Sequence, residues 1–472
     1  MASIEQLASD PAAGASPGET AAERAERTAA AVAAWIEANL GTVVAIERQP
    51  RWRPAWFVDV VGDNGLLQLY VRGAREGGGN VYPLQQEAAL LQVLEAHGIP
   101  APHVYGMIAE PWAIVMDRLP GRANLGTVED DAERSAILDD YIDILARIHA
   151  IEPSAFEAAG LTTPRGPEAV ALTWFNRVED RYRQTKQRPE PLLEFCIKWV
   201  RRNVPAGRED PRFILCDPGQ FMFHEGRISG VLDLEFAHIG DVAHDLASLR
   251  LRTFAEPLGD VGAALRRYEA LTDAPLDLDL IDFHTVKWVL CTPISLVTTM
   301  HAPPQVPELM QYVEWFHQYS LIGIEGIANM IGVALPDVAL PDPAPTRYTG
   351  IFEAITPAVR SLAGDDPVAQ FRRDRTAAMA EYLRRIDAYG AAIEAADLDD
   401  LAGLLGERPA DWRAGDAALE AFVLAAGPEH DAALVRLFHR RAMRQMRLLE
   451  PILNRTKTIA HLIPLPELLR RG

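Results

Sequence analysis

The sequence has few cysteines, no surplus of basic residues and no long apolar run. Its 472 residues include 3 cysteines, and 46 Lys and Arg stand against 66 Asp and Glu, a formal net charge of −20. Because Cys196, Cys216 and Cys291 are few and scattered, we expect neither a disulfide framework nor a zinc site. The acidity excludes a dedicated binder of nucleic acid or of an anionic membrane, whereas a small phosphorylated ligand needs only a local patch or a metal ion.

Two further absences bear on location. The most apolar long segment, Trp288–Met300, is interrupted by a proline and by Ser and Thr residues, and it is shorter than the ~20 apolar residues that span a bilayer. The N-terminal segment has neither the basic nor the apolar region of a signal peptide. Hydrophobic residues make up 49% of the chain, which suits a soluble protein of several folding units. We therefore expect a cytoplasmic protein with no membrane or nucleic-acid partner.

The chain divides by composition into five segments. Apolar or alternating runs at Trp56–Val61 and Leu66–Val71 flank Gly-Asp-Asn-Gly, which predicts a β-hairpin. Prolines recur near residue 340 without an apolar period, which predicts a semi-rigid linker. We predict, in chain order, a mobile arm and leader helix (1–40), a β-rich lobe (41–118), a mainly helical lobe (119–334), the linker (335–348) and a helical appendage (349–472).

The most informative stretch is residues 213–250. A short strand leads to Asp217 in an Asp-Pro-Gly turn, and a hairpin with strands at 220–223 and 228–235 places Asp233 inside an apolar run. A carboxylate in such a run is costly to bury unless a partner compensates its charge, and a divalent cation does so. With the amide of Gln220, the two carboxylates supply the hard oxygen ligands that suit Mg²⁺. The alternative is that Asp217 caps a turn and Asp233 pairs with a buried arginine or with backbone donors.

Several motifs follow one another in the order of a known family. Val231–Glu235 has the pattern of a metal-binding strand, Gly240-Asp241 and Asp245–Ala247 follow it at the expected spacing, and Leu145–His149 precedes it as a helix end. With these motifs, residues 30–335 resemble the aminoglycoside phosphotransferase and choline-kinase-like family, relatives of the protein kinases. The resemblance implies an α+β, two-lobed protein-kinase-like fold, with a small β-rich N-lobe and a larger helical C-lobe. Here an all-α appendage follows these lobes.

The resemblance also implies roles in the β-rich lobe. Arg72 stands where relatives place a basic residue that faces the nucleotide phosphates, and Glu87 matches the helix glutamate that pairs with it. Residues 113–120 resemble the hinge whose main chain bonds adenine, near Met116 and Arg118. The nucleotide that the resemblance implies is ATP or GTP.

The sequence departs from the family pattern at two loops. The catalytic His-Gly-Asp is Leu-Cys-Asp at 215–217, and Met222 stands where the family has a metal-binding Asn. We therefore take Gln220 as the ligand, in a loop shortened by two residues, and such a loop can misplace the base at a cost of about 100-fold in rate. Arg51 and Arg53 lie where relatives have a Gly/Ser-rich turn, and they either contact phosphates or are ordinary surface cations.

For a kinase of this kind the resemblance implies Asp217 as the base and Asp233 with Gln220 as the ligands of Mg²⁺. Arg72, oriented by Glu87, then grips the phosphates, and its charge and bidentate geometry differ from those of a lysine. Near the site we expect structural roles for His149, Asp241 and Asp245. Core packing, with partial lining of the substrate site as the alternative, is expected for Trp174, Phe175 and Tyr182.

Other reactive side chains do not form a recognisable site in the sequence. Cys216 neighbours Asp217, and an acidic neighbour does not lower the pKa of a thiol, so we expect no nucleophile there. His224 and His238 show no metal-ligand spacing.

Three functions stay open. The first is a small-molecule kinase that phosphorylates a hydroxyl group of a metabolite, and the appended helical domain favours a hydroxyacyl-type compound. The second is a nucleotide-binding pseudokinase that acts as a scaffold, which the altered catalytic loop favours and the retained Asp217, Asp233, Arg72 and Glu87 oppose. The third is an aminoglycoside-type antibiotic phosphotransferase. A homodimer or protein partner would contact residues 349–466.

Overall fold

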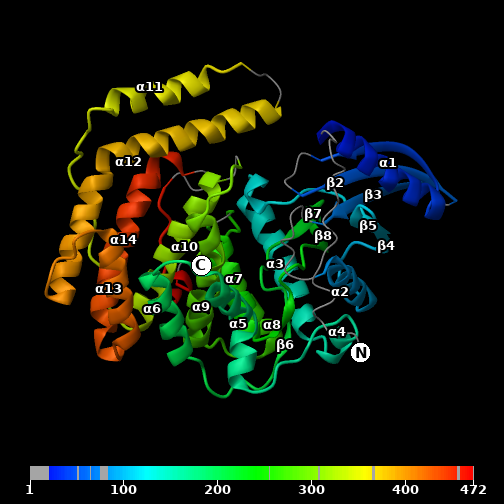
Figure 1. Cartoon of the computed structure of the whole chain (residues 1–472). Coiled ribbons are helices and arrows are strands. Elements are labelled where there is room, and N and C mark those ends of the chain that lie inside the picture. The colour runs from blue at the N-terminus through cyan, green and yellow to red at the C-terminus, as the bar shows by residue number, and fades with distance from the viewer. Residues whose placement is uncertain are drawn as a thin grey trace. The chain divides into compact units, whose positions relative to one another are not determined.

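The computed structural model describes residues 21–49, 53–63, 65–74, 83–254, 256–306, 309–363, 367–453 and 458–470. Within it the chain forms two compact units that interleave along the sequence. The first unit comprises Met1–Pro164, Asp210–Asp245 and Pro257–Pro275, and the second comprises Arg165–Glu209, Leu246–Glu256 and Leu276–Gly472. Figure 1 labels most of the helices and strands of both units.

The first unit begins with a helix and a five-stranded antiparallel sheet. The helix is α1 (Ala21–Asn39), and the strands lie in the order β1-β2-β3-β5-β4. Their bounds are β1 (Thr42–Arg48), β2 (Ala55–Gly62), β3 (Gly65–Gly73), β4 (Val104–Ala109) and β5 (Trp112–Asp117). Gly41 links α1 to β1 at φ +138°, where a Cβ atom would stand 2.4 Å from the Val61 carbonyl oxygen, so this turn requires glycine.

The side chains of β3 point alternately to the two faces of the sheet, and the two faces contact different helices. Leu69 and Val71 join Val32 and Ile36 of α1 in one buried cluster. Because successive side chains of a strand point to opposite faces, Arg72 lies on the other face of the sheet. Helix α2 (Leu84–Ala96) covers that face and brings Glu87 to Arg72. The predicted hairpin is confirmed, because β2 and β3 contain its two runs.

The rest of the first unit is helical apart from two small antiparallel ladders. The helices are α3 (Asp131–His149), α4 (Ser154–Glu157), α8 (Val261–Thr272) and the 3₁₀ turn η2 (Leu125–Thr127). One ladder pairs β6 (Arg212–Ile214) with β9 (His238–Gly240), and the other pairs β7 (Phe221–His224) with β8 (Arg227–Val231). Helix α7 (Val242–Arg252) starts directly after β9 and continues into the second unit.

The hairpin of β7 and β8 differs from its prediction at the end of the second strand. The prediction that its second strand runs through residue 235 is wrong, because β8 ends at Val231. Asp233 has a φ of +63°, a left-handed conformation that cannot continue a strand ladder. Its side chain is not embedded in the sheet but bonded to Arg72.

The regular elements among the described residues of the second unit are all helices. Its elements are α5 (Pro167–Thr185), α6 (Pro191–Arg202), α9 (Leu278–His301), α10 (Leu309–Met330), α11 (Thr349–Arg360), α12 (Pro367–Leu405), α13 (Trp412–Ala425), η3 (Pro428–His430), α14 (Asp431–Leu449), η4 (Glu450–Ile452) and α15 (Leu465–Leu468). Residues 335–346 form neither helix nor strand, as their prolines predict. The predicted domain boundaries as a whole stay a prediction.

One buried cluster joins helices from both sides of this proline-rich segment. Met310 and Leu321 of α10 pack with Met443, Met446 and other residues of α14. Helix α14 therefore shares a buried core with α10.

Helix α9 is the described helix whose length and composition would allow it to cross a membrane. Of its most apolar window, 72% is buried inside the protein, where it packs against α5 and α10. That burial is the property of a core helix.

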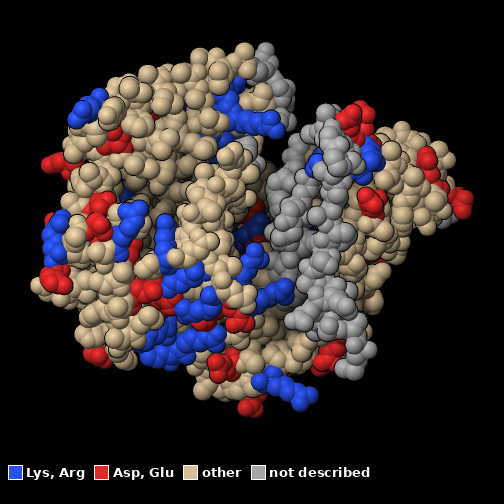
Figure 2. Space-filling model, in the orientation of Figure 1, with Lys and Arg blue, Asp and Glu red and all other residues tan. Residues whose placement is uncertain are grey.

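The acidic surplus is not gathered in one field on the face seen in Figure 2. Among the coloured residues, acidic and basic side chains lie side by side. Several of the basic side chains in the second unit are ion-paired, as Arg183 is with Glu194 and Arg201 with Glu179. On this face the acidic side chains therefore do not mark a substrate site.

Candidate active site

A buried ionic network connects the sheet, α2 and the segment after β8. The Nη2 atom of Arg72 lies 2.6 Å from Asp233 Oδ1 and 3.2 Å from Glu87 Oε1. Burial by itself would lower the pKa of Arg72, but the charges of Glu87 and Asp233 outweigh it and hold the pKa above its usual range. Burial raises the pKa of Glu87, because Arg72 only partly offsets the lost hydration.

Arg53 and Glu235 extend this network. Arg53 Nη2 lies 2.6 Å from Glu235 Oε2, and Arg72 Nη2 lies 3.9 Å from the same oxygen. Only 7% of Arg53 is exposed, so the alternative that it is an ordinary surface cation is wrong. Arg51 lies outside the described residues. The network as a whole holds three carboxylates and two guanidinium groups, an excess of one negative charge.

Asp217 lies in a turn whose backbone is held by hydrogen bonds to the side chain of Asp245. Cys216 adopts φ +68°, and in this conformation two consecutive N–H groups reach the same carboxylate. The N–H of Leu215 donates to Asp245 Oδ2 at 2.8 Å, and that of Cys216 donates to Oδ1 at 2.7 Å. Asp245 is fully buried, so these bonds exchange little with water.

Further hydrogen bonds hold the turn from its other sides. The N–H of Gly219 donates to the Tyr141 hydroxyl at 2.7 Å, and Gln220 Nε2 donates to Asp217 Oδ2 at 2.7 Å. His149 Nε2 lies 3.0 Å from Asp245 Oδ2, and its Nδ1 lies 2.7 Å from the Tyr268 hydroxyl. The shortened loop is therefore anchored although the histidine of the family motif is replaced by Leu215.

Asp241 lies at the start of α7. It is 1% exposed, and its Oδ1 accepts the N–H of Ala243 at 3.0 Å. This bond satisfies one of the first N–H groups of the helix. Asp241 and Asp245 thus both bond backbone N–H groups, one in α7 and one in the Asp217 turn.

The predicted hinge ends the strand β5. Met116 is buried and pairs with Tyr70 of β3, and the guanidinium of Arg118 stacks 3.8 Å from the Phe57 ring centroid. The N–H of Asp117 donates to the His103 carbonyl, and the N–H of Arg118 donates to Gln68. A nucleobase that used either of these two N–H groups would have to replace a bond within the protein.

The three aromatic residues suggested for the substrate lie on α5 in the second unit. Trp174, Phe175 and Tyr182 are 6%, 0% and 1% exposed. The Tyr182 hydroxyl donates to Glu194 Oε1 at 2.9 Å, and burial together with this carboxylate raises the pKa of Tyr182. These residues pack in the core, and their role in lining a substrate site stays a prediction.

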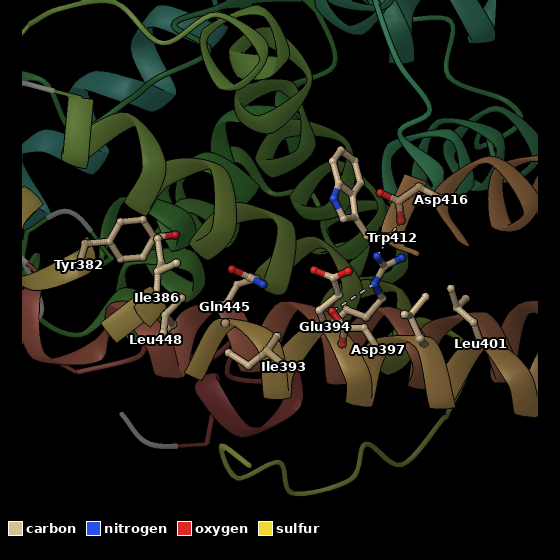
Figure 3. A pocket seen from close by; sticks show the side chains of 13 residues that line it. Tyr382, Ile386, Ile393, Glu394, Asp397, Leu401, Trp412, Asp416, Gln445 and Leu448 are labelled. Carbon is tan, nitrogen blue, oxygen red and sulfur yellow. Dashed lines mark hydrogen bonds and ion pairs between the residues drawn. The ribbon is translucent and has the colours of Figure 1, made fainter. Parts of the chain in front are cut away.

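The second unit contains a cavity of about 300 Å³ among α12, α13 and α14. Apolar side chains such as Ile386, Ile393 and Leu448 line it (Figure 3). Arg441 Nη2 lies 2.7 Å from Asp416 Oδ1. The other charged lining residues are Glu394 and Asp397, and Asp397 Oδ2 lies 3.7 Å from Arg441 Nε.

Sequence reasoning missed three contributors to the candidate active site. In the sequence Glu235 stands only as a neighbour of Asp233 in the motif, and no local pattern indicates that Arg53 is its partner. Tyr141 and Tyr268 carry no signal in the sequence, because their contacts with Gly219 and His149 depend on the packing of α3 and α8.

A family model and solved structures match this chain. Residues 52–278 match the model of the phosphotransferase enzyme family. A candidate aminoglycoside phosphotransferase from Ralstonia eutropha JMP134 is similar, with a TM-score of 0.50 and 16% identity, over 62% of this chain and 95% of that one. The macrolide 2′-phosphotransferase MphH from Brachybacterium faecium gives 0.44 and 18%, over 61% and 97%. The first likeness supports the α+β, protein-kinase-like fold, and no curated protein matched the chain.

Proposed function

We propose that this chain, whose residues 52–278 match the model of the phosphotransferase enzyme family, is a member of that family and transfers the γ-phosphate of ATP or GTP to a hydroxyl group of a small molecule. The observation that carries the proposal is the ionic network in which Arg72 of β3 meets Glu87 of α2 and Asp233 after β8. Phosphoryl transfer requires positioning and neutralisation of charge more than covalent chemistry from the protein.

Arg72 serves as the phosphate clamp in this proposal. A guanidinium stays charged at all physiological pH values and can bond two phosphate oxygens at once. In the present structure its Nη2 atom bonds Asp233 at 2.6 Å. A phosphate group that binds Arg72 would take the place of that carboxylate, while Glu87 keeps the guanidinium oriented.

Asp233 and Gln220 would hold Mg²⁺. A carboxylate and an amide provide the hard oxygen atoms that this ion prefers, and the excess negative charge of the network suits a cation, so the residues fit the ion. When bound, Mg²⁺ neutralises charge on the nucleotide phosphates. Release of Asp233 from Arg72 would make its carboxylate available.

Asp217 serves as the base. Its carboxylate would accept the proton of the acceptor hydroxyl while the hydroxyl oxygen bonds the γ-phosphorus and the bond to the β-phosphate oxygen breaks. Asp245 and Tyr141 support this role, because they fix the backbone on both sides of Asp217. The anchoring compensates for the missing histidine of the loop.

The helical appendage bears on the class of acceptor. A hydroxyacyl-type compound is our preference for this chain because of the helical appendage, and an aminoglycoside-type acceptor is the alternative. The pseudokinase scaffold remains a second candidate, because Leu215 and Gln220 replace family residues in the catalytic loop. The exposed apolar side chains Ile351, Leu362 and Leu383 are consistent with a homodimer or protein partner at the appendage.

One experiment separates these candidates. Mg·ATP and Mg·GTP turnover is measured against a panel of hydroxyacyl compounds, hydroxylated metabolites and aminoglycosides, with nucleotide binding measured by calorimetry with and without Mg²⁺. Asp233→Asn is the test variant, and Asp131→Asn, at a side chain 90% exposed on α3, is the matched control. We expect turnover with one class, lost in Asp233→Asn and kept in the control. If the nucleotide binds with the same affinity with and without Mg²⁺ and no acceptor is phosphorylated, the kinase proposal is contradicted and the pseudokinase scaffold is supported.

A further inference from the structure

Three buried side chains that can bind a metal lie close together, and one of them directly precedes Asp217 in the chain. Cys216, His238 and His244 are 0%, 3% and 0% exposed, and one ligand atom from each lies within 4.8 Å of the other two. They come from three different elements, which explains why the sequence shows no ligand spacing. Cys216 follows β6, His238 begins β9 opposite Ile214, and His244 lies in the first turn of α7.

The separation of the sulfur and one nitrogen fits a tetrahedral ion. Cys216 Sγ lies 3.6 Å from His244 Nε2. Zinc binds sulfur at about 2.3 Å and imidazole nitrogen at about 2.0–2.1 Å, and a tetrahedral angle between such bonds places the two atoms about 3.5 Å apart. An ion between them therefore requires little movement of this pair.

The surroundings also orient the ligands. His238 Nδ1 lies 2.9 Å from the Phe236 carbonyl oxygen, to which it donates, so the lone pair is on Nε2. A histidine that donates its other N–H to a carbonyl is the usual arrangement at a metal. The backbone of Cys216 is fixed through its N–H bond to Asp245 Oδ1. The rings of His238 and His244 lie edge to face with centroids 5.6 Å apart.

We propose that Cys216, His238 and His244 form a metal site that takes Zn²⁺ or a similar borderline-soft divalent ion. On binding, the thiol gives up its proton to solvent and the thiolate bonds the metal, while the two imidazoles bind as neutral ligands. The fourth position of a tetrahedral ion is left for a small ligand such as water. The ion ties the end of β6 to β9 and α7, directly beside the turn that carries Asp217. The alternative is a thiol–imidazole hydrogen bond without a metal.

The test uses the full-length protein and does not depend on turnover. Metal content is measured by mass spectrometry after purification, and the chelator-treated protein is titrated with Co²⁺ while its visible and near-ultraviolet absorption is recorded. We expect about one ion per chain, d–d bands of a four-coordinate site and a thiolate-to-cobalt charge-transfer band. Absence of both metal and cobalt bands in the folded wild type overturns the proposal and leaves the hydrogen bond.

Variants assign the ligands. Cys216→Ser should abolish the charge-transfer band, and His244→Gln should weaken Co²⁺ binding by 10-fold or more. Cys291→Ser is the matched control, because this thiol is equally buried but lies on α9. A charge-transfer band that survives Cys216→Ser, or that disappears in Cys291→Ser, contradicts the assignment. Circular dichroism establishes whether each variant is folded. If a variant is not folded, the Co²⁺ titration of the wild type alone tests whether the metal site exists.

Discussion

Removal of the Arg72 guanidinium should destabilise the first unit strongly, and a second substitution should restore part of the loss. In Arg72→Met the carboxylate of Glu87 loses the cation 3.2 Å away while it remains only 5% exposed. Removing one partner of a buried ion pair costs about 3–5 kcal/mol, because the remaining charge stays without compensation. That is a large share of the ~5–15 kcal/mol that stabilises a typical domain.

The second substitution is Glu87→Gln, which removes the stranded charge. We expect Arg72→Met/Glu87→Gln to be more stable than Arg72→Met alone, with a coupling of about 1–3 kcal/mol in the double-mutant cycle. Arg48→Met, at an exposed position of β1, is the matched control and should change stability by less than ~0.5 kcal/mol.

Hydrogen exchange with mass spectrometry measures the effect within this unit alone. Amides of β3 and α2 that exchange through unfolding should exchange about 10²–10⁴-fold faster in Arg72→Met, since about 3–5 kcal/mol is lost and each 1.4 kcal/mol corresponds to about 10-fold. A change below about 5-fold, or equal losses in the single and double variants, would refute the reasoning that Arg72 compensates a buried charge.

Three further predictions follow from the same contacts. Asp245→Asn should lower kcat about 100-fold or more with little change in nucleotide Kd, because the N–H groups of Leu215 and Cys216 lose the carboxylate that holds the Asp217 turn in place. Unchanged kinetics would show that the turn does not need this carboxylate. The hydrogen bond to Glu325 raises the pKa of His461, so its stabilisation is present below about pH 6.5 and is lost as the pH rises through the raised value. Urea unfolding across this range should therefore show a decline that His461→Gln removes, and an unchanged decline would contradict the role of this pair. Deletion of 349–472 should give an insoluble or unfolded protein, because it exposes the face of α10 that α14 covers, and a soluble, folded product in sedimentation would contradict the shared core.

The hairpin of β2 and β3 could be predicted because its signals are local. The runs Trp56–Val61 and Leu66–Val71 around a glycine-rich turn define β2 and β3 almost to the residue. Helix α2 combines an apolar face with a stop at Gly98. Arg72 and Glu87 could then be paired by their positions in the family pattern.

The end of β8 could not be predicted in this way. Residues 228–235 are apolar enough to continue a strand, yet Asp233 turns into the left-handed region and bonds Arg72. That conformation depends on a partner 161 positions away in the sequence, which no local pattern records. The same limit applies to Arg53, whose buried bond to Glu235 was not visible in its neighbourhood.

The cysteine and histidine cluster shows the limit most clearly. The sequence predicts no zinc site, because His238 shows no ligand spacing and the cysteines are scattered. Ligands that come from a loop, a strand and a helix acquire their proximity from the pairing of β6 with β9 and from the start of α7. Spacing rules describe sites built within one element or hairpin, and they do not apply to this arrangement.

The measurement that tests the central claim most directly is the rate of γ-phosphate transfer by Asp217→Asn with the acceptor that the panel identifies. Asn keeps the shape of the side chain and can still accept a bond from Gln220, but it cannot take up the proton of the acceptor hydroxyl. We predict that kcat falls by about 10²–10⁴-fold while the Kd of Mg·ATP stays within about 3-fold of the wild type. A variant that keeps the wild-type kcat would contradict the account, because the base would then have to lie elsewhere.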